Sequence, residues 1–190
     1  MLLFAHTGIT LGAAALAAGT LSSRRSSAGT HKSWFAELSR HLDIRLLLLG
    51  SMLPDIIDKP VGQYLFRETF SNGRIVSHTL LFLILVSAVG FFLCKYRGQK
   101  WLLTLAAGIF THLLMDEMWL SPVTLFWPLM GWEFPRWEMA EIVVRWFLAI
   151  FTVPKLFITE LAGLLVLLSF GFYLLIKKKF RSFILRGKVL

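Results

Sequence analysis

Long apolar stretches alternate with short polar connections along the chain. Five stretches are candidates for membrane segments: Leu2–Leu21, Leu46–Ile57, Thr79–Cys94, Trp101–Leu120 and Leu156–Ile176. A helix rises about 1.5 Å per residue, so about 20 residues span the hydrocarbon core of a bilayer. The pattern therefore predicts an all-α fold, a polytopic transmembrane helical bundle of about five membrane segments, formed as a single domain over residues 1–190.

Two parts of this pattern are less regular. Leu46–Ile57 is short and contains Pro54, so we expect it either to cross the membrane as a short or tilted helix or to form a re-entrant segment. Ala140–Phe151 has the amphipathic pattern of an interfacial helix, which lies on the membrane surface. Within the single domain we expect a metal-site core over residues 1–130, followed by the interfacial helix and the last span over residues 136–190.

Composition supports a membrane protein. Of the 190 residues, 56% are hydrophobic and 16% are charged, whereas soluble domains have roughly 45–50% and about 25%. The single cysteine, Cys94, excludes an intramolecular disulfide and argues against a zinc site built from cysteines.

The basic residues set the expected orientation. A net charge of +9 would suggest nucleic-acid binding in a soluble protein, but here three basic clusters flank apolar stretches: Arg24, Arg25 and Lys32, then Lys95–Lys100, then Lys177–Lys188. If five crossings are counted, all three clusters lie on the cytoplasmic side, as the positive-inside tendency requires. We therefore expect a multi-pass protein of the cytoplasmic membrane with no nucleic-acid partner.

Histidines and aspartates gather near the opposite, extracytoplasmic face. On this topology six of them, from four different segments, lie at similar depth: His6, Asp55, Asp58, His78, His112 and Asp116. The orientation rests on Lys and Arg alone, so this convergence is independent of it. Ionisable residues in a membrane segment cost about 2.5–3.5 kcal/mol on insertion scales and usually mark a functional interior.

The spacing of these residues favours a metal site. His112 and Asp116 are four residues apart, so they project from one face of a helix. Asp55 and Asp58 are three apart and share a side if that segment is helical. Zinc accepts both imidazole nitrogen and carboxylate oxygen. We therefore expect a divalent metal, with zinc as the first candidate, manganese or iron as alternatives, and one to three ions.

The residues around these positions resemble a known family. The segments Ser51–Asp58, Gly73–Leu81, His112–Asp116 and Phe126–Pro128, together with His6, resemble the motifs of the YdjM-like family of membrane-bound, predicted metal-dependent hydrolases. The resemblance covers roughly residues 1–130 and implies a helical membrane protein with a metal-assisted hydrolytic site. That family is distantly similar to zinc-dependent phospholipases C, whose helical core also uses a His-x-x-x-Asp pair.

These observations together predict a metal-dependent hydrolase that cleaves a phosphate ester of a membrane lipid at the outer face. The predicted metal ligands are His6, Asp55, His78, His112 and Asp116. Asp58 is predicted to ligate the metal, to act as general base, or to orient a ligand. Arg74 is a predicted catalytic residue that also binds the anionic headgroup, together with Lys59.

Two other classes of protein share these features. A non-catalytic metal-binding or ion-transporting membrane protein would also place carboxylates and histidines among its helices, but with ligands spread along the membrane normal. A structural membrane protein whose polar residues pair only with one another would bind no metal. Ligands at a single depth favour the hydrolase.

Overall fold

The computed structural model describes residues 3–25, 34–136, 148–149 and 151–189. Within these residues the fold is all-α, with eight α-helices, short π- and 3₁₀-helical segments and no strand. The all-α prediction is confirmed. The predicted interfacial helix, Ala140–Phe151, lies mostly outside the described residues.

Each predicted apolar segment is helical, with bounds that differ from the prediction by a few residues. The long elements are η1 (Ala5–Ile9) with α1 (Thr10–Arg25), α3 (Ile44–Lys59) with η2 (Pro60–Leu65), α4 (Leu80–Arg97), α5 (Trp101–Met115) and α8 (Pro154–Ile176). The short elements are α2 (Trp34–His41), η3 (Val76–His78), η4 (Met118–Leu120), α6 (Pro122–Leu125) and α9 (Phe180–Arg186).

Helix α3 is longer than the sequence pattern suggested. It begins after Asp43, whose side chain caps the helix by accepting the backbone N–H of Arg45 at 3.0 Å. Pro54 lies inside α3, and the chain continues directly into η2. A proline removes one backbone donor from a helix, and here the helix continues past it. Asp55 and Asp58 therefore both lie on a helix, as their spacing requires if they are to share one side.

Among the described residues, two helices are long and apolar enough to cross a membrane: α4 and α8. Only 6% of the apolar window of α4 and 22% of that of α8 is buried, so neither resembles the core helix of a soluble protein. Helix α5 is equally apolar but has 15 residues. Crossings by α1, α3 and α5 stay predictions of the sequence.

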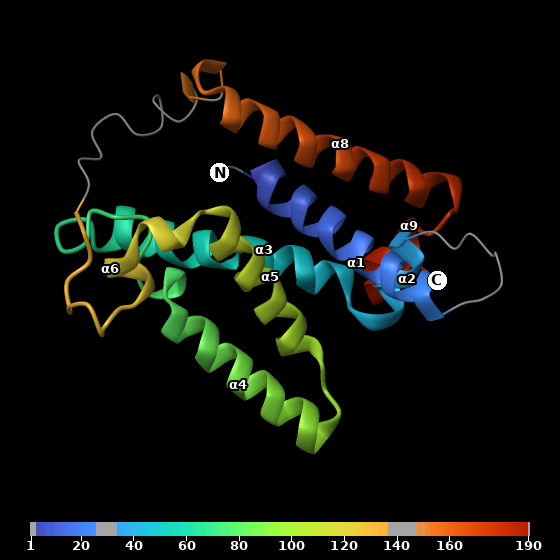
Figure 1. The fold of residues 1–190 in the computed structure, drawn as a ribbon, viewed down its shortest axis with the longest axis horizontal. Coiled ribbons are helices and arrows are strands. Elements are labelled where there is room, and N and C mark those ends of the chain that lie inside the picture. Colours follow the sequence, from blue (N-terminus) through green and yellow to red (C-terminus); the bar gives the residue numbers. More distant parts are fainter. Residues whose placement is uncertain (1–2, 26–33, 137–147, 150, 190) are drawn as a thin grey trace.

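Glycines let the helices that carry the site approach closely. Helix α8 lies alongside η1 and α1, and α4 lies at the edge of the bundle next to α5 (Figure 1). A Cβ atom on Gly108 of α5 would lie 2.5 Å from the carbonyl oxygen of Leu47 in α3. A Cβ atom on Gly8 would overlap the backbone of Gly163 in α8. Small residues commonly allow such contacts between membrane helices. Gly108 lies one turn before His112, and Gly8 lies two residues after His6.

Candidate metal centre

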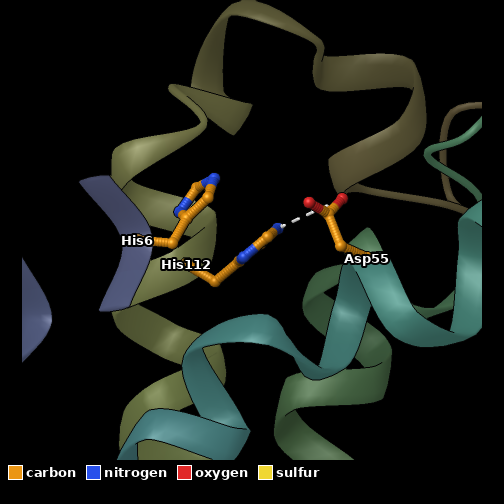
Figure 2. A group of neighbouring side chains, drawn as sticks. All are labelled: His6, Asp55 and His112. Carbon is orange, nitrogen blue, oxygen red and sulfur yellow. Dashed lines mark ion pairs between the residues drawn. The ribbon is translucent and has the colours of Figure 1, made fainter. Parts of the chain in front are cut away.

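The histidines and aspartates that the sequence singled out meet in one cluster. They come from η1, the last turn and a half of α3, η3, and the end of α5, and are His6, Asp55, Asp58, His78, His112 and Asp116. The three histidines and Asp58 are 0% exposed, Asp55 is 8% exposed, and the side chain of Asp116 is 4% exposed. Figure 2 shows three of them close together, with the ring of His112 directed at Asp55. The structure thus brings residues from four distant segments into one buried site.

The hydrogen bonds of two histidines fix their tautomers. His78 Nδ1 lies 2.7 Å from Asp58 Oδ2, and His112 Nδ1 lies 2.7 Å from the backbone carbonyl oxygen of Ser51. A carbonyl oxygen or an ionised carboxylate can only accept, so each Nδ1 must carry the hydrogen and donate it. In the neutral form of either ring, this leaves the Nε2 atom with a lone pair. This is how histidine ligands are usually held in metal sites.

The two Nε2 atoms face each other across 3.1 Å. Two lone pairs at that distance repel unless a proton or a cation lies between them. Asp55 Oδ1 lies 3.7 Å from His78 Nε2 and 3.9 Å from His112 Nε2, and Asp116 Oδ2 lies 3.9 Å from His78 Nε2. Ligands at about 2.0–2.1 Å from a tetrahedral zinc ion are separated by roughly 3.4 Å. These donors therefore fit a divalent cation in kind and in spacing.

His6 completes the cluster from the N-terminal helix. Its ring stacks on that of His112 with 4.2 Å between centroids, and its Nε2 lies 3.1 Å from Asp116 Oδ1. His6 Nδ1 is buried and has no hydrogen-bond partner among the described residues. A buried polar atom without a partner is costly, and a cation would provide the missing interaction.

In the part of the chain that the structure describes, two groups of side chains have ligand atoms within 4.8 Å of one another: His6, Asp55 and His112, and also His78, His112 and Asp116. Together the groups contain the five residues that the sequence predicted as ligands. His112 belongs to both groups, so it is the centre of the cluster.

Asp58 lies outside these groups, and both of its oxygens accept hydrogen bonds. Oδ2 accepts the backbone N–H of Ile75 at 2.7 Å, that of His78 at 3.2 Å, and the Nδ1 hydrogen of His78. Oδ1 accepts the backbone N–H of Ser77 at 3.1 Å. Of its three predicted roles, this geometry favours orienting a ligand: Asp58 holds both the η3 turn and the His78 ring.

The two basic residues predicted to bind the headgroup reach the cluster from its rim. Lys59 Nζ lies 2.6 Å from Asp55 Oδ2, and Arg74 Nη2 lies 2.8 Å from Asp116 Oδ2. Each cation is therefore paired with a predicted metal ligand. Both side chains are partly exposed, at 36% and 27%, so each joins the buried carboxylates to the outside of the site.

Glu160 of α8 was not among the site residues predicted from the sequence. Its Oε2 accepts the backbone N–H groups of Phe4 and Ala5 at 3.1 and 3.3 Å, and the residue is 8% exposed. It therefore caps the start of the helix that carries His6. A single acidic residue within an apolar span was the available signal, because such residues are costly in a membrane and seldom incidental.

Replacing Glu160 by alanine should weaken the site without removing a ligand. The loss of two hydrogen bonds to a charged acceptor is expected to lower the free energy of unfolding by about 1–3 kcal/mol and to loosen His6. Thermal unfolding in detergent and metal retention on dialysis measure the two effects. Glu68→Ala, an exposed acidic position in the turn after η2, is the matched control. Unchanged stability and metal retention in Glu160→Ala would contradict this role.

The fold and this cluster define a class of protein: a helical membrane protein with buried histidines and aspartates that could hold a metal ion. The chain belongs to the YdjM inner membrane protein family, which matches residues 1–181. The resemblance is thus confirmed, and it extends beyond residue 130 to include α8. No curated protein and no solved structure matches the chain.

Proposed function

We propose that this protein is a metal-dependent hydrolase that cleaves a phosphate ester of a membrane lipid at the extracytoplasmic face. One observation carries the proposal. The Nε2 lone pairs of His78 and His112 converge to 3.1 Å, with both tautomers fixed from behind and carboxylate oxygens less than 4 Å away. A divalent cation between the two lone pairs would bind both nitrogens, and the nearby carboxylates would balance its charge.

The contacts of each residue indicate its role. Nitrogen atoms of the three histidines and oxygens of Asp55 and Asp116 would hold the metal, and a bound divalent ion supplies Lewis-acid polarisation and activates water near neutral pH. Asp58 keeps His78 in the binding tautomer. Arg74 lies beside Asp116, where its guanidinium can bind the phosphate of a substrate. Lys59 can do the same beside Asp55.

The position of the cluster supports a fixed site over an ion pathway. The ligand candidates lie at helix ends: Asp55 near the end of α3, His78 just before α4, His112 in the last turn of α5. Among the described residues, the groups able to hold a metal both lie at this one place. A conducting protein would need further sites along the bundle.

Hydrolysis assays on metal-exchanged protein test the proposal. Purified protein in lipid nanodiscs would be stripped with chelator, reloaded separately with zinc, manganese or iron, and given phospholipids and lipid phosphates. We expect hydrolysis that disappears on stripping and returns with at least one metal. Protein that binds metal but hydrolyses none of these lipids would overturn the hydrolase assignment and favour a non-catalytic metal-binding protein.

A further inference from the structure

A cavity of about 330 Å³ adjoins the metal centre on the side of Arg74. It lies where the end of α5, η4 and the first turns of α8 meet. Among the described residues its polar lining includes Arg74, Asp116, Glu117 and Lys155, and its apolar lining includes Leu120 and Leu156. This volume is within the range of small-molecule sites. Because Asp116 belongs to both the cavity and the ligand cluster, a molecule in the cavity would touch the metal centre.

Two cations face this cavity from different parts of the chain. Arg74 uses Nη2 to bind Asp116, and a guanidinium has five N–H donors, so it can hold the carboxylate and an anion together. Lys155 is paired with Glu117, at 2.5 Å between Nζ and Oε1, and its side chain is 63% exposed. Glu117 has a positive φ of 52°, and its carboxylate is the partner that an incoming anion would replace.

The lining also has apolar residues, one of which is exposed on the outside of the bundle. Leu120 is 71% exposed, and Leu156 lies one residue after Lys155 at the start of an apolar helix that is a candidate membrane span. A cavity lined by two cations and by leucines, of which Leu120 is exposed, suits an amphiphile. Its anionic group would lie toward Asp116 and its chain toward the lipid.

A neighbouring cavity of about 250 Å³ is a poorer candidate. It also touches Arg74, Leu120 and Ser121, but among the described residues its lining contains no second cation and no predicted metal ligand. A phosphate group there would have one charged partner and no access to the cluster. The larger cavity is therefore the one that matches a phosphate-bearing substrate.

We propose that the larger cavity is the substrate's binding site and takes the phosphate group of an anionic lipid. Lys155 and Arg74 bind the phosphate, and Glu117 holds Lys155 until the phosphate replaces it. The identification of this lipid as the substrate rests on the proposed function, whereas its binding does not. Lys155 is thereby assigned as a substrate-binding residue. Lys59 does not line this cavity, so it faces the centre from elsewhere.

Binding is tested with chelator-stripped protein, in which turnover cannot occur. Dioleoyl phosphatidic acid would be titrated into detergent-purified protein and bound lipid counted by native mass spectrometry. We expect Lys155→Ala to lower the affinity by about tenfold, equivalent to one charged contact. Glu117→Gln should raise it several-fold, because it releases Lys155 and removes a negative charge. Lys177→Ala, at the opposite end of the same helix and exposed, should leave the affinity unchanged.

The two substitutions are expected to change the lipid affinity in opposite directions. A variant that merely misfolds loses affinity, so a gain in Glu117→Gln cannot arise from damage. Equal affinities in Lys155→Ala, Glu117→Gln and wild type would overturn the proposal. In a second experiment, inorganic phosphate is added at millimolar concentrations as a competitor. If it displaces the lipid as effectively as added lipid does, the site binds free phosphate and the lipid assignment is overturned.

The cavity proposal and the proposed function can be refuted independently of each other. Suppose that substitutions of Lys155 and Glu117 change lipid binding, but the metal-loaded protein hydrolyses no lipid. This result would support the cavity as a lipid-binding site and refute the hydrolase assignment. Metal-dependent hydrolysis whose KM for the lipid phosphate is the same in wild type and Lys155→Ala would retain the hydrolase and refute the cavity.

Discussion

Replacing His112 by alanine is expected to abolish metal retention and hydrolysis together. His112 belongs to both groups of ligand atoms, and its Nε2 lies 3.1 Å from His78 Nε2. Changes to residues that only orient a ligand cost 10–100-fold in metal affinity, so the loss of this central ligand should exceed about 100-fold. Elemental mass spectrometry and a lipid-phosphate hydrolysis assay measure the two losses.

His41→Ala is the matched control for this substitution. His41 is the last residue of α2, it belongs to neither group of ligand atoms, and its side chain is 61% exposed beside Glu37. This variant should keep wild-type metal content and activity. Loss of the hydrogen bond to Ser51 should lower the free energy of unfolding of His112→Ala by only about 1–3 kcal/mol. A His112→Ala protein that keeps stoichiometric metal and full activity would refute the proposed metal centre.

Asp58→Asn should give the second large effect, through a residue that touches no metal in this account. The carboxylate accepts four hydrogens, three at Oδ2 and one at Oδ1. An amide of the same shape has one oxygen, so its NH₂ group must face a backbone donor, and His78 Nδ1 loses a charged partner. We expect metal affinity to fall 10–100-fold and the free energy of unfolding by about 1–3 kcal/mol.

Asp43→Asn provides the same chemical change at the other end of α3. Asp43 caps the first turn of that helix, and asparagine is about as good an N-cap as aspartate, so metal affinity should be unchanged. Competition with a coloured chelator measures affinity in both variants. If Asp58→Asn binds metal as tightly as wild type, the orienting role is wrong. If binding is lost entirely while the fold is intact, Asp58 is a ligand.

The hydropathy pattern was sufficient to locate the helices, because apolar runs of membrane length have few alternatives to helix. It was less reliable at their ends. Helix α3 extends two residues beyond the predicted segment at each end, and α5 ends at Met115, five residues before the predicted end of that span. The turn at Glu117, with its positive φ, carries no strong sequence signal.

The ligand cluster was predictable because its members are chemically conspicuous. A histidine or aspartate in an apolar segment is rare, and the segments could be placed at one depth from the basic residues. Positioning depends on backbone contacts that leave little trace in a sequence. The carbonyl of Ser51 that orients His112 could be any residue's carbonyl, and the approach of Gly8 to Gly163 joins segments more than 150 residues apart.

The cavity was not predictable for a related reason. Lys155 was not singled out in the sequence, because a lysine at the start of an apolar helix resembles an ordinary anchor at the lipid headgroups. Only the fold places it in the lining of the same cavity as Arg74 and Asp116. Helix α8, which carries Lys155, packs on η1, which carries His6.

X-ray absorption at the zinc edge of zinc-loaded protein tests the central claim most directly. We expect nitrogen and oxygen ligands at about 2.0–2.1 Å, including the multiple-scattering signal of at least two imidazoles, with no sulfur. Absence of stoichiometric zinc, or a sulfur ligand near 2.3 Å from Cys94, would contradict it.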